Sequence, residues 1–219
     1  MSKPYVVFGY GSLIWKPPPH VIEETPGFLK GYVRRFAQSS NDHRGTPEVS
    51  PIGPVTLIHI DEWNKFSSTD IFPHEDVVWG IAYTIAPVYA AETKTYLDYR
   101  EKNGYSEATV DVWGLRDGEE VVIRPNVYVG QPDNPAFVGS EPYDKLAKHI
   151  WSHQGASGQN KDYLYKLSES IRRLAPESHD SHLFTLERMV RAIDAAEAQD
   201  FAVGNGAKKS LSLTVSNSG

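Results

Sequence analysis

Short runs of β-branched and aromatic residues, each bounded by glycine, proline or polar residues, fill the first part of the chain. Such runs are typical of strands, because branched and aromatic side chains fit a pleated, half-buried surface. The dipeptide Asp117-Gly118, between the last two runs, favours a hairpin turn. The pattern predicts strands at Tyr5–Phe8, Gly31–Gln38, Val55–Ile60, Val77–Ile85, Ser106–Trp113 and Val121–Tyr128.

Longer segments with few interruptions predict helices, most of them near the end of the chain. The segment Ala90–Asn103 contains neither proline nor glycine, and Gly104 after it favours a helix end. Strands followed by a helical final third favour an α+β fold over alternating βαβ units. Further helices are expected at Pro142–His153, Lys161–Leu174 and His182–Ala198, with breaks at Gly155–Gln159 and Ala175–Asp180.

The length of the chain suits a single domain, which we expect to span residues 1–198. The polar stretch Asp61–Asp76, between two predicted strands, indicates a variable insertion. Asn41–Pro54 is rich in Asp, Gly and Pro and predicts an ordered surface loop. Because Gly204–Gly219 is small and polar, we expect residues 199–219 to form a disordered tail.

Composition narrows the function classes. The 219 residues are 40% hydrophobic and 23% charged, which excludes wholesale disorder. A net charge of −6 without a long basic run argues against nucleic acid or an anionic membrane as the main partner. With no cysteine, the chain has no disulfide, thiol nucleophile or cysteine-bound metal. No secretory signal or membrane-spanning apolar stretch is evident, so we expect a cytoplasmic protein.

The first candidate for chemistry is the strand end Val7-Phe8-Gly9-Tyr10-Gly11-Ser12-Leu13. Two glycines separated by one residue permit a tight turn and leave backbone N–H groups uncovered. Successive exposed N–H groups form a nest that suits a phosphate or carboxylate. An ordinary turn is the alternative, because Gly-x-Gly alone is a weak signal. A dinucleotide fingerprint is disfavoured, since the loop continues into Trp15 and three prolines instead of a helix.

The second candidate is Glu101, in the last turn of a predicted helix. The negative end of the helix dipole disfavours its charge, and nearby Tyr99 and Tyr105 would reduce its solvation. Both effects raise the pKa of the carboxyl group toward that of a useful general base. The alternative is a solvated glutamate paired with Lys102 or Arg100.

Two other groupings carry less weight. Ser12, His43 and Asp42 lack the Gly-x-Ser-x-Gly elbow of a nucleophilic triad, and adjacent His and Asp side chains point in different directions. The stretch His179-Asp180-Ser181-His182 has no third ligand at a suitable spacing for a metal. Asp180 is better explained as a helix cap.

Four ordered motifs stand out along the chain: Val7 to Pro17, Asp42-His43-Arg44-Gly45-Thr46-Pro47, Tyr96 to Tyr105, and Val127-Tyr128-Val129-Gly130. Three shorter segments accompany them: Asp133-Asn134-Pro135, Gly155-Ala156-Ser157-Gly158 and Tyr163-Leu164. Together these segments resemble the ChaC-type γ-glutamylcyclotransferases, over roughly residues 5 to 192.

The resemblance implies a closed β-barrel flanked by helices. It also implies cleavage of glutathione into 5-oxoproline and Cys-Gly, without metal or cofactor. Glu101 would be the catalytic residue and Tyr128 a residue of the pocket, with Arg44 as a further cation for the substrate. The substrate-binding stretch would be Val7, Phe8, Gly9, Tyr10, Gly11, Ser12 and Leu13.

The chemistry of that reaction suits these residues. The substrate's own α-amino group attacks its γ-carbonyl, and a base must first take a proton from the amine, which is mostly protonated at neutral pH. Glu101 would do this and return the proton to the departing Cys-Gly amine. The N–H groups of Gly11, Ser12 and Leu13 would either hold the glutamyl group ready to cyclise or stabilise the oxyanion.

Pro54 departs from the resemblance, because members of the family commonly carry arginine at this position. If that arginine binds a substrate carboxylate, affinity here is weaker or another cation such as Arg44 replaces it. Cyclotransfer on another γ-glutamyl compound therefore stays open. So does a non-catalytic regulator that binds γ-glutamyl ligands or a membrane protein, although a pure binder has no need of Glu101 beside the substrate's amine.

Overall fold

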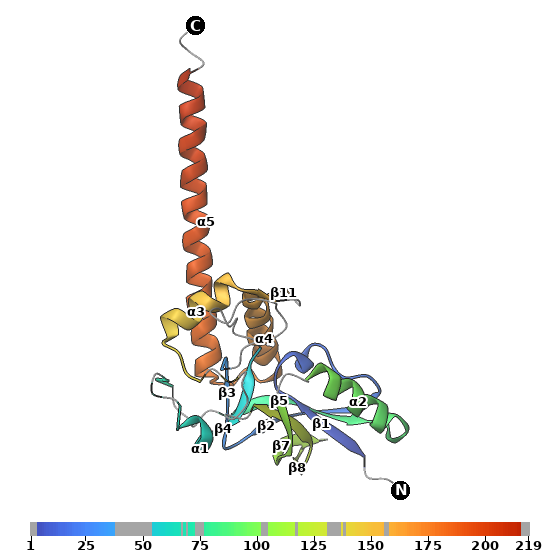
Figure 1. Cartoon of the computed structure of the whole chain (residues 1–219). Coiled ribbons are helices and arrows are strands. Elements are labelled where there is room, and N and C mark those ends of the chain that lie inside the picture. The colour runs from blue at the N-terminus through green and yellow to red at the C-terminus, as the bar shows by residue number, and fades with distance from the viewer. Residues whose placement is uncertain are drawn as a thin grey trace.

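The computed structural model describes residues 4–37, 54–66, 68, 70–72, 77–101, 105–116, 118–130, 137, 139–155 and 158–215, and side chains as far as residue 199. Strands and helices are segregated in an α+β arrangement, as predicted. Figure 1 shows α3, α4 and α5 grouped together, while α2 lies apart from them beside β1.

A seven-stranded sheet forms the centre of the molecule. The strand order is β6-β9-β1-β5-β2-β7-β8, and β1 is parallel to β9 while the other neighbours are antiparallel. The sheet places β1 between β9 and β5, with Val7 opposite Asn126 of β9 and Gly9 opposite Ile81 of β5. The strands are β1 Tyr5–Gly9, β2 Val21–Leu29, β5 Val78–Ile85, β6 Tyr105–Thr109, β7 Val112–Arg116, β8 Glu119–Ile123 and β9 Asn126–Gly130.

The closed barrel implied by the family resemblance is wrong, because the sheet is curled but open. Closure would require β6 and β8 to pair, and in the described part of the chain each has a neighbour on one side only. Exposed charged residues at the start of β8, Glu119 and Glu120, disfavour pairing at this edge. The strands β3 (Tyr32–Arg35) and β4 (Thr56–His59) form a separate antiparallel pair, as do the short strands β10 (Gln154–Gly155) and β11 (Gly158–Gln159).

Helices cover the sheet with their apolar faces. In α3 and α4 the buried residues recur at helical spacing, and they join the main core with residues of β1, β5 and β9. None of the described helices is long and apolar enough to cross a membrane. The helices are η1 Ser12–Ile14, α1 Ile60–Trp63, η2 Pro87–Tyr89, α2 Ala90–Arg100, α3 Tyr143–Ser152, α4 Asn160–Leu174 and α5 Ser181–Val215.

Most predicted elements are present, but the strands of the second half are divided differently. The predicted strand Ser106–Trp113 is two strands, β6 and β7, which pair with different neighbours. The predicted strand Val121–Tyr128 likewise belongs to both β8 and β9. The expected hairpin around Asp117-Gly118 is the one between β7 and β8. The strand β2, with Pro26 and Gly27 inside it, was not predicted.

The last helix is longer than expected from the sequence. It continues past Ala198 to Val215, while its side chains are described only to residue 199. The alanine-rich stretch around Ala195, Ala196 and Ala198 favours this continuation. The division into a domain of residues 1–198 and a tail of residues 199–219 stays a prediction.

The stretch Asp61–Asp76 is joined to the domain by a buried carboxylate. Asp70 accepts hydrogen bonds from Arg35 Nε at 2.8 Å and from Trp63 Nε1 at 2.6 Å. The side chains of Arg35 and Asp70 are 5% and 2% exposed, so this ion pair is protected from solvent. The stretch therefore has a fixed anchor on β3.

Candidate active site

The loop after β1 is shaped by close contacts that glycine permits. Gly9 ends β1, and a Cβ atom on it would lie 2.6 Å from Leu13 Cβ. The chain then turns into η1, where the Ile14 N–H donates to the Gly11 carbonyl at 3.0 Å. The Tyr83 hydroxyl of β5 donates to the Leu13 carbonyl at 2.8 Å. The close contact at Gly9 and the hydrogen bond from Tyr83 thus hold the loop against the sheet.

Two further hydrogen bonds fix Tyr10. Its hydroxyl donates to the Tyr128 carbonyl of β9 at 2.8 Å, and its own carbonyl accepts from Arg34 Nη1 at 2.7 Å. The Tyr10 side chain is 8% exposed and lies in the core cluster. Tyr10 therefore links the loop to β9 and β3.

Glu101 lies directly after α2, and its N–H donates to the Leu97 carbonyl at 2.8 Å. Burial raises the pKa of its carboxyl group, and the guanidinium of Arg100, whose Nε lies 3.5 Å from Glu101 Oε1, partly opposes this. Tyr105 lines the cavity with it, as expected, whereas Tyr99 is 71% exposed and does not shield it. The pairing with Arg100 that the sequence left open as an alternative is therefore present, but the pKa of the Glu101 carboxyl group is still raised.

One cavity joins the loop to Glu101. Its wall includes two tyrosines from distant elements, Tyr105 of β6 and Tyr163 of α4. Burial, and after it the charge of Glu101, raises the pKa of these two hydroxyl groups, which therefore stay protonated at neutral pH. The lining residues are Phe8, Tyr10, Gly11, Ser12, Leu13, Pro54, Val55, Glu101, Tyr105, Tyr128 and Tyr163.

The predicted site residues fall into three groups. Most of the predicted loop, together with Glu101 and Tyr128, lines the cavity. Val7 is fully buried in the core behind it, and Gly9 supports the loop through its contact with Leu13. Arg44 lies outside the described residues, as do Asp42 and His43 of the rejected triad.

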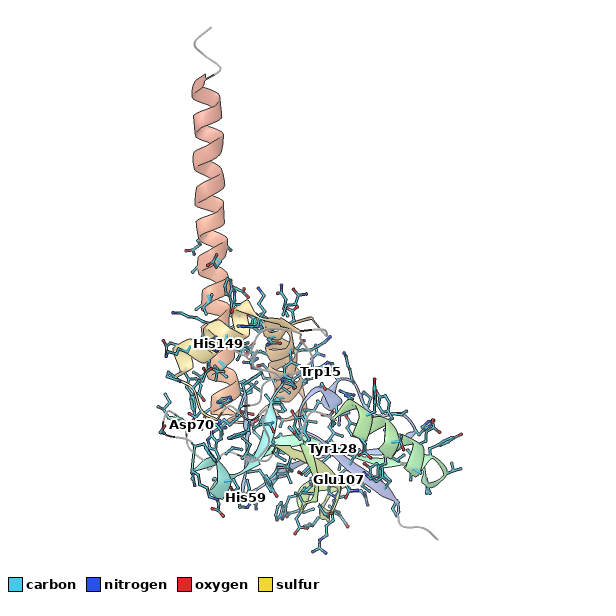
Figure 2. All side chains as sticks on the ribbon, in the orientation of Figure 1. Trp15, His59, Asp70, Glu107, Tyr128 and His149 are labelled. Atoms are coloured by element: carbon cyan, nitrogen blue, oxygen red, sulfur yellow. The ribbon has the colours of Figure 1, made fainter. Side chains whose placement is uncertain are left out.

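Tyr128 lies opposite Glu107 in the β6–β9 ladder (Figure 2). Its hydroxyl donates to Asp98 Oδ1 on α2 at 2.8 Å, so this group is already committed to the protein. Tyr128 therefore contributes its ring and backbone to the cavity wall, and ties α2 to the sheet just ahead of Glu101.

Three residues around the cavity were not proposed from the sequence as site residues. Tyr163 comes from α4, and its hydroxyl lies 3.0 Å from where a Cβ of Gly11 would be. Val55 precedes β4 and lines the same wall. Arg100 lies beside Glu101. The Tyr163-Leu164 segment of the family resemblance was the signal that pointed to Tyr163.

Asp180 has the capping role predicted for it. Its Oδ1 accepts from the Leu183 N–H at 3.1 Å, at the start of α5. Its other oxygen accepts from Arg34 Nε at 2.9 Å. Within the described residues, no group of three His, Asp or Glu side chains is placed to share a metal ion.

Comparison with known proteins identifies the family. A model of the ChaC-like protein family matches residues 5–193. The glutathione-specific γ-glutamylcyclotransferase of Schizosaccharomyces pombe is 46% identical over 187 residues, which cover 84% of this chain and 91% of that protein. The protein of the same name from Saccharomyces cerevisiae is 38% identical, over 77% of this chain and 85% of its own. A crystal structure of a yeast γ-glutamyl cyclotransferase specific to glutathione matches with a TM-score of 0.74 at 32% identity, covering 87% of this chain and 97% of the other. The chain therefore belongs to the ChaC-like protein family.

Proposed function

We propose that this chain is a glutathione-specific γ-glutamylcyclotransferase. The observation that carries the proposal is the cavity in which a partly buried carboxylate with a raised pKa, Glu101, lines the same wall as the loop Gly11-Ser12-Leu13. A base poised in this way suits the intramolecular cyclisation that the names of its relatives describe. The products are 5-oxoproline and Cys-Gly.

In the proposed mechanism Glu101 takes a proton from the substrate's α-ammonium group. The freed amine nitrogen attacks the γ-carbonyl carbon and closes a five-membered ring. The bond between that carbon and the cysteine nitrogen then breaks, and Glu101 returns the proton to the departing amine. The ring nitrogen gives up its second proton, which the Cys-Gly amine takes up as it becomes an ammonium group. No proton or electron is gained or lost overall, so this lyase-type reaction needs no co-reactant. The absence of a cofactor and the cytoplasmic location stay predictions.

The loop is proposed to hold the glutamyl end of the substrate. The carbonyls of Gly11, Ser12 and Leu13 are hydrogen-bonded within the protein, which fixes the direction of the peptide units. N–H groups in fixed directions can hold the glutamyl group so that its amine lies close to its γ-carbonyl. They can also stabilise the charge that develops on the carbonyl oxygen, because donors that are already oriented need not reorganise during the reaction. The protonated hydroxyls of Tyr105 and Tyr163 are further donors on the same wall. Val7, Phe8, Gly9 and Tyr10 support this loop from β1.

The test is direct. Purified full-length protein is incubated with glutathione, and 5-oxoproline and Cys-Gly are both quantified by mass spectrometry. Equal release of the two products supports the proposal. Saturable glutathione binding without product across a range of pH would show a binding protein instead.

A second substrate class is favoured by Pro54. This residue lies in the cavity wall, where it brings no charge to meet a substrate carboxylate. Cyclotransfer on other γ-glutamyl compounds is therefore tested beside glutathione, with γ-glutamyl dipeptides at equal concentration. A kcat/KM for the dipeptides equal to that for glutathione would remove the glutathione specificity from the proposal. Arg44 remains a proposed cation for the substrate.

Gly11→Ala is expected to lower kcat/KM for glutathione about tenfold, with a smaller effect on stability. The added methyl group would lie 3.0 Å from the Tyr163 hydroxyl and 3.4 Å from Val55 Cγ2, both side-chain atoms on the cavity wall. Gly9→Ala is the matched comparison, because its Cβ would meet Leu13 Cβ at 2.6 Å, and its main effect should be a lower Tm. Unchanged kcat/KM in Gly11→Ala would contradict the placement of the substrate here.

A further inference from the structure

Arg100 does not line the cavity itself, but it contacts two residues that do, Glu101 and Ser12. Its Nε lies 3.5 Å from Glu101 Oε1, and its Nη2 donates to the Ser12 hydroxyl. Its Nη1 donates to the Lys16 carbonyl at 3.4 Å, at the far end of the same loop. One planar guanidinium thus contacts the end of α2 and two points of the loop after β1.

We propose that Arg100 is a positioning residue that holds the Glu101 carboxylate and the Ser12 loop at a fixed separation. This goes beyond the proposed function and rests on it, since the function assigns the base and the loop but nothing that joins them. The guanidinium suits this task because its donors lie in one rigid plane. A flexible ammonium group cannot make the same three contacts at once.

The surroundings of Glu101 explain why a cation is useful there. The groups that face it are Arg100 from α2, Tyr10 from the loop after β1, Tyr105 from β6 and Tyr163 from α4. The three tyrosines have raised pKa values and are neutral at pH 7, so they bring no positive charge to offset the partly buried carboxylate. Arg100 does offset it, and therefore keeps part of the Glu101 population ionised and able to accept a proton.

Two substitutions separate the charge of Arg100 from its geometry. Arg100→Gln removes both, whereas Arg100→Lys keeps a positive charge and loses the planar fork. Arg124→Gln is the matched control, because Arg124 is paired with Asp111 at an exposed site outside the cavity. Circular dichroism shows whether each full-length variant is folded.

Two readouts apply to each variant. One is the pH profile of kcat and KM for glutathione. The other is a titration of the Glu101 carboxyl by ¹³C NMR, assigned by its loss in Glu101→Gln, which needs no turnover. A purely structural role for Arg100 would change neither the titration nor the acid limb of the profile.

In Arg100→Gln we expect the Glu101 titration and the acid limb of kcat to move to higher pH, and kcat/KM to fall on the order of tenfold. In Arg100→Lys we expect both titrations to stay near the wild-type position, while KM rises because the bond to Ser12 is lost. Arg124→Gln should match the wild type.

The proposal is overturned if Glu101 titrates at the same pH in Arg100→Gln as in the wild type, or if Arg124→Gln moves it equally. It is also overturned if Arg100→Lys has the same KM as the wild type. If the wild-type protein releases no 5-oxoproline, the proposed function fails, while the NMR titration still decides whether Arg100 controls Glu101.

Discussion

Glu101→Gln is expected to reduce kcat for 5-oxoproline release from glutathione by about 10²- to 10⁴-fold. Glutamine has nearly the same shape as glutamate but cannot accept the proton of the substrate's amine, so KM should change little. Steady-state rates measured over a range of glutathione concentrations separate the two parameters.

Glu107→Gln is the matched control for this substitution. Glu107 lies on β6 and pairs with Lys94 at 2.8 Å, outside the cavity. The same loss of a carboxylate there should leave kcat near the wild-type value. Wild-type turnover by Glu101→Gln would remove Glu101 from the mechanism.

The raised pKa of Glu101 also predicts how the stability of Glu101→Gln compares with that of the wild type. Burial raises the pKa above that of an unfolded glutamate, so above the folded-state value the ionised carboxylate costs stability, and the cost disappears as pH falls. Glutamine carries no such cost. The Tm of Glu101→Gln at pH 7 should therefore equal or exceed that of the wild type, as calorimetry can show. In the wild type, activity should fall as pH falls through the same raised pKa.

The loop and the glutamate could be found from the sequence because each has a local signal. Two glycines at the end of an apolar run predict a bare turn, and a glutamate before Asn103-Gly104 predicts a helix end. That the loop and Glu101 share one cavity depends on the tertiary structure, and from the sequence it could be predicted only through the family resemblance. Arg100 has no local signal, because its contact with Ser12 joins residues far apart in the chain.

The missed strand β2 has a physical explanation. Pro26 and Gly27 interrupt its apolar pattern, and each normally weakens a strand. Here β7 pairs with β2 only from Gly27 to Leu29, so the missing N–H of Pro26 costs no hydrogen bond on that side. A Cβ on Gly27 would lie 2.6 Å from the Trp113 carbonyl, so the glycine permits the close approach of β7.

The strand pattern of the sequence also could not predict that the sheet is open. The run from Ser106 to Trp113 alternates without a clear break, so it predicted one strand. In the structure the chain changes partner within this run, from β9 to β2. Partner choice depends on neighbours far away in sequence, and it decides which strands remain at the edges.

Arg34→Met is expected to lower the free energy of unfolding by about 3–5 kcal/mol. Arg34 is 1% exposed and donates to Asp180, which directly precedes α5, to the Tyr10 carbonyl in the loop and to the Trp79 carbonyl on β5. Methionine fills similar space but leaves the buried Asp180 carboxylate without its cation. Urea unfolding at pH 7 measures the loss.

A double variant separates the lost ion pair from lost packing. Asp180→Asn keeps an oxygen to cap α5 at the Leu183 N–H while it removes the charge. If the uncompensated carboxylate causes the loss, Arg34→Met combined with Asp180→Asn should be more stable than Arg34→Met alone. Arg116→Met, at an exposed pair with Glu23, should change stability by less than about 1 kcal/mol. A loss in Arg34→Met no larger than that in Arg116→Met would mean that the buried pair does not hold α5 to the loop of the candidate site.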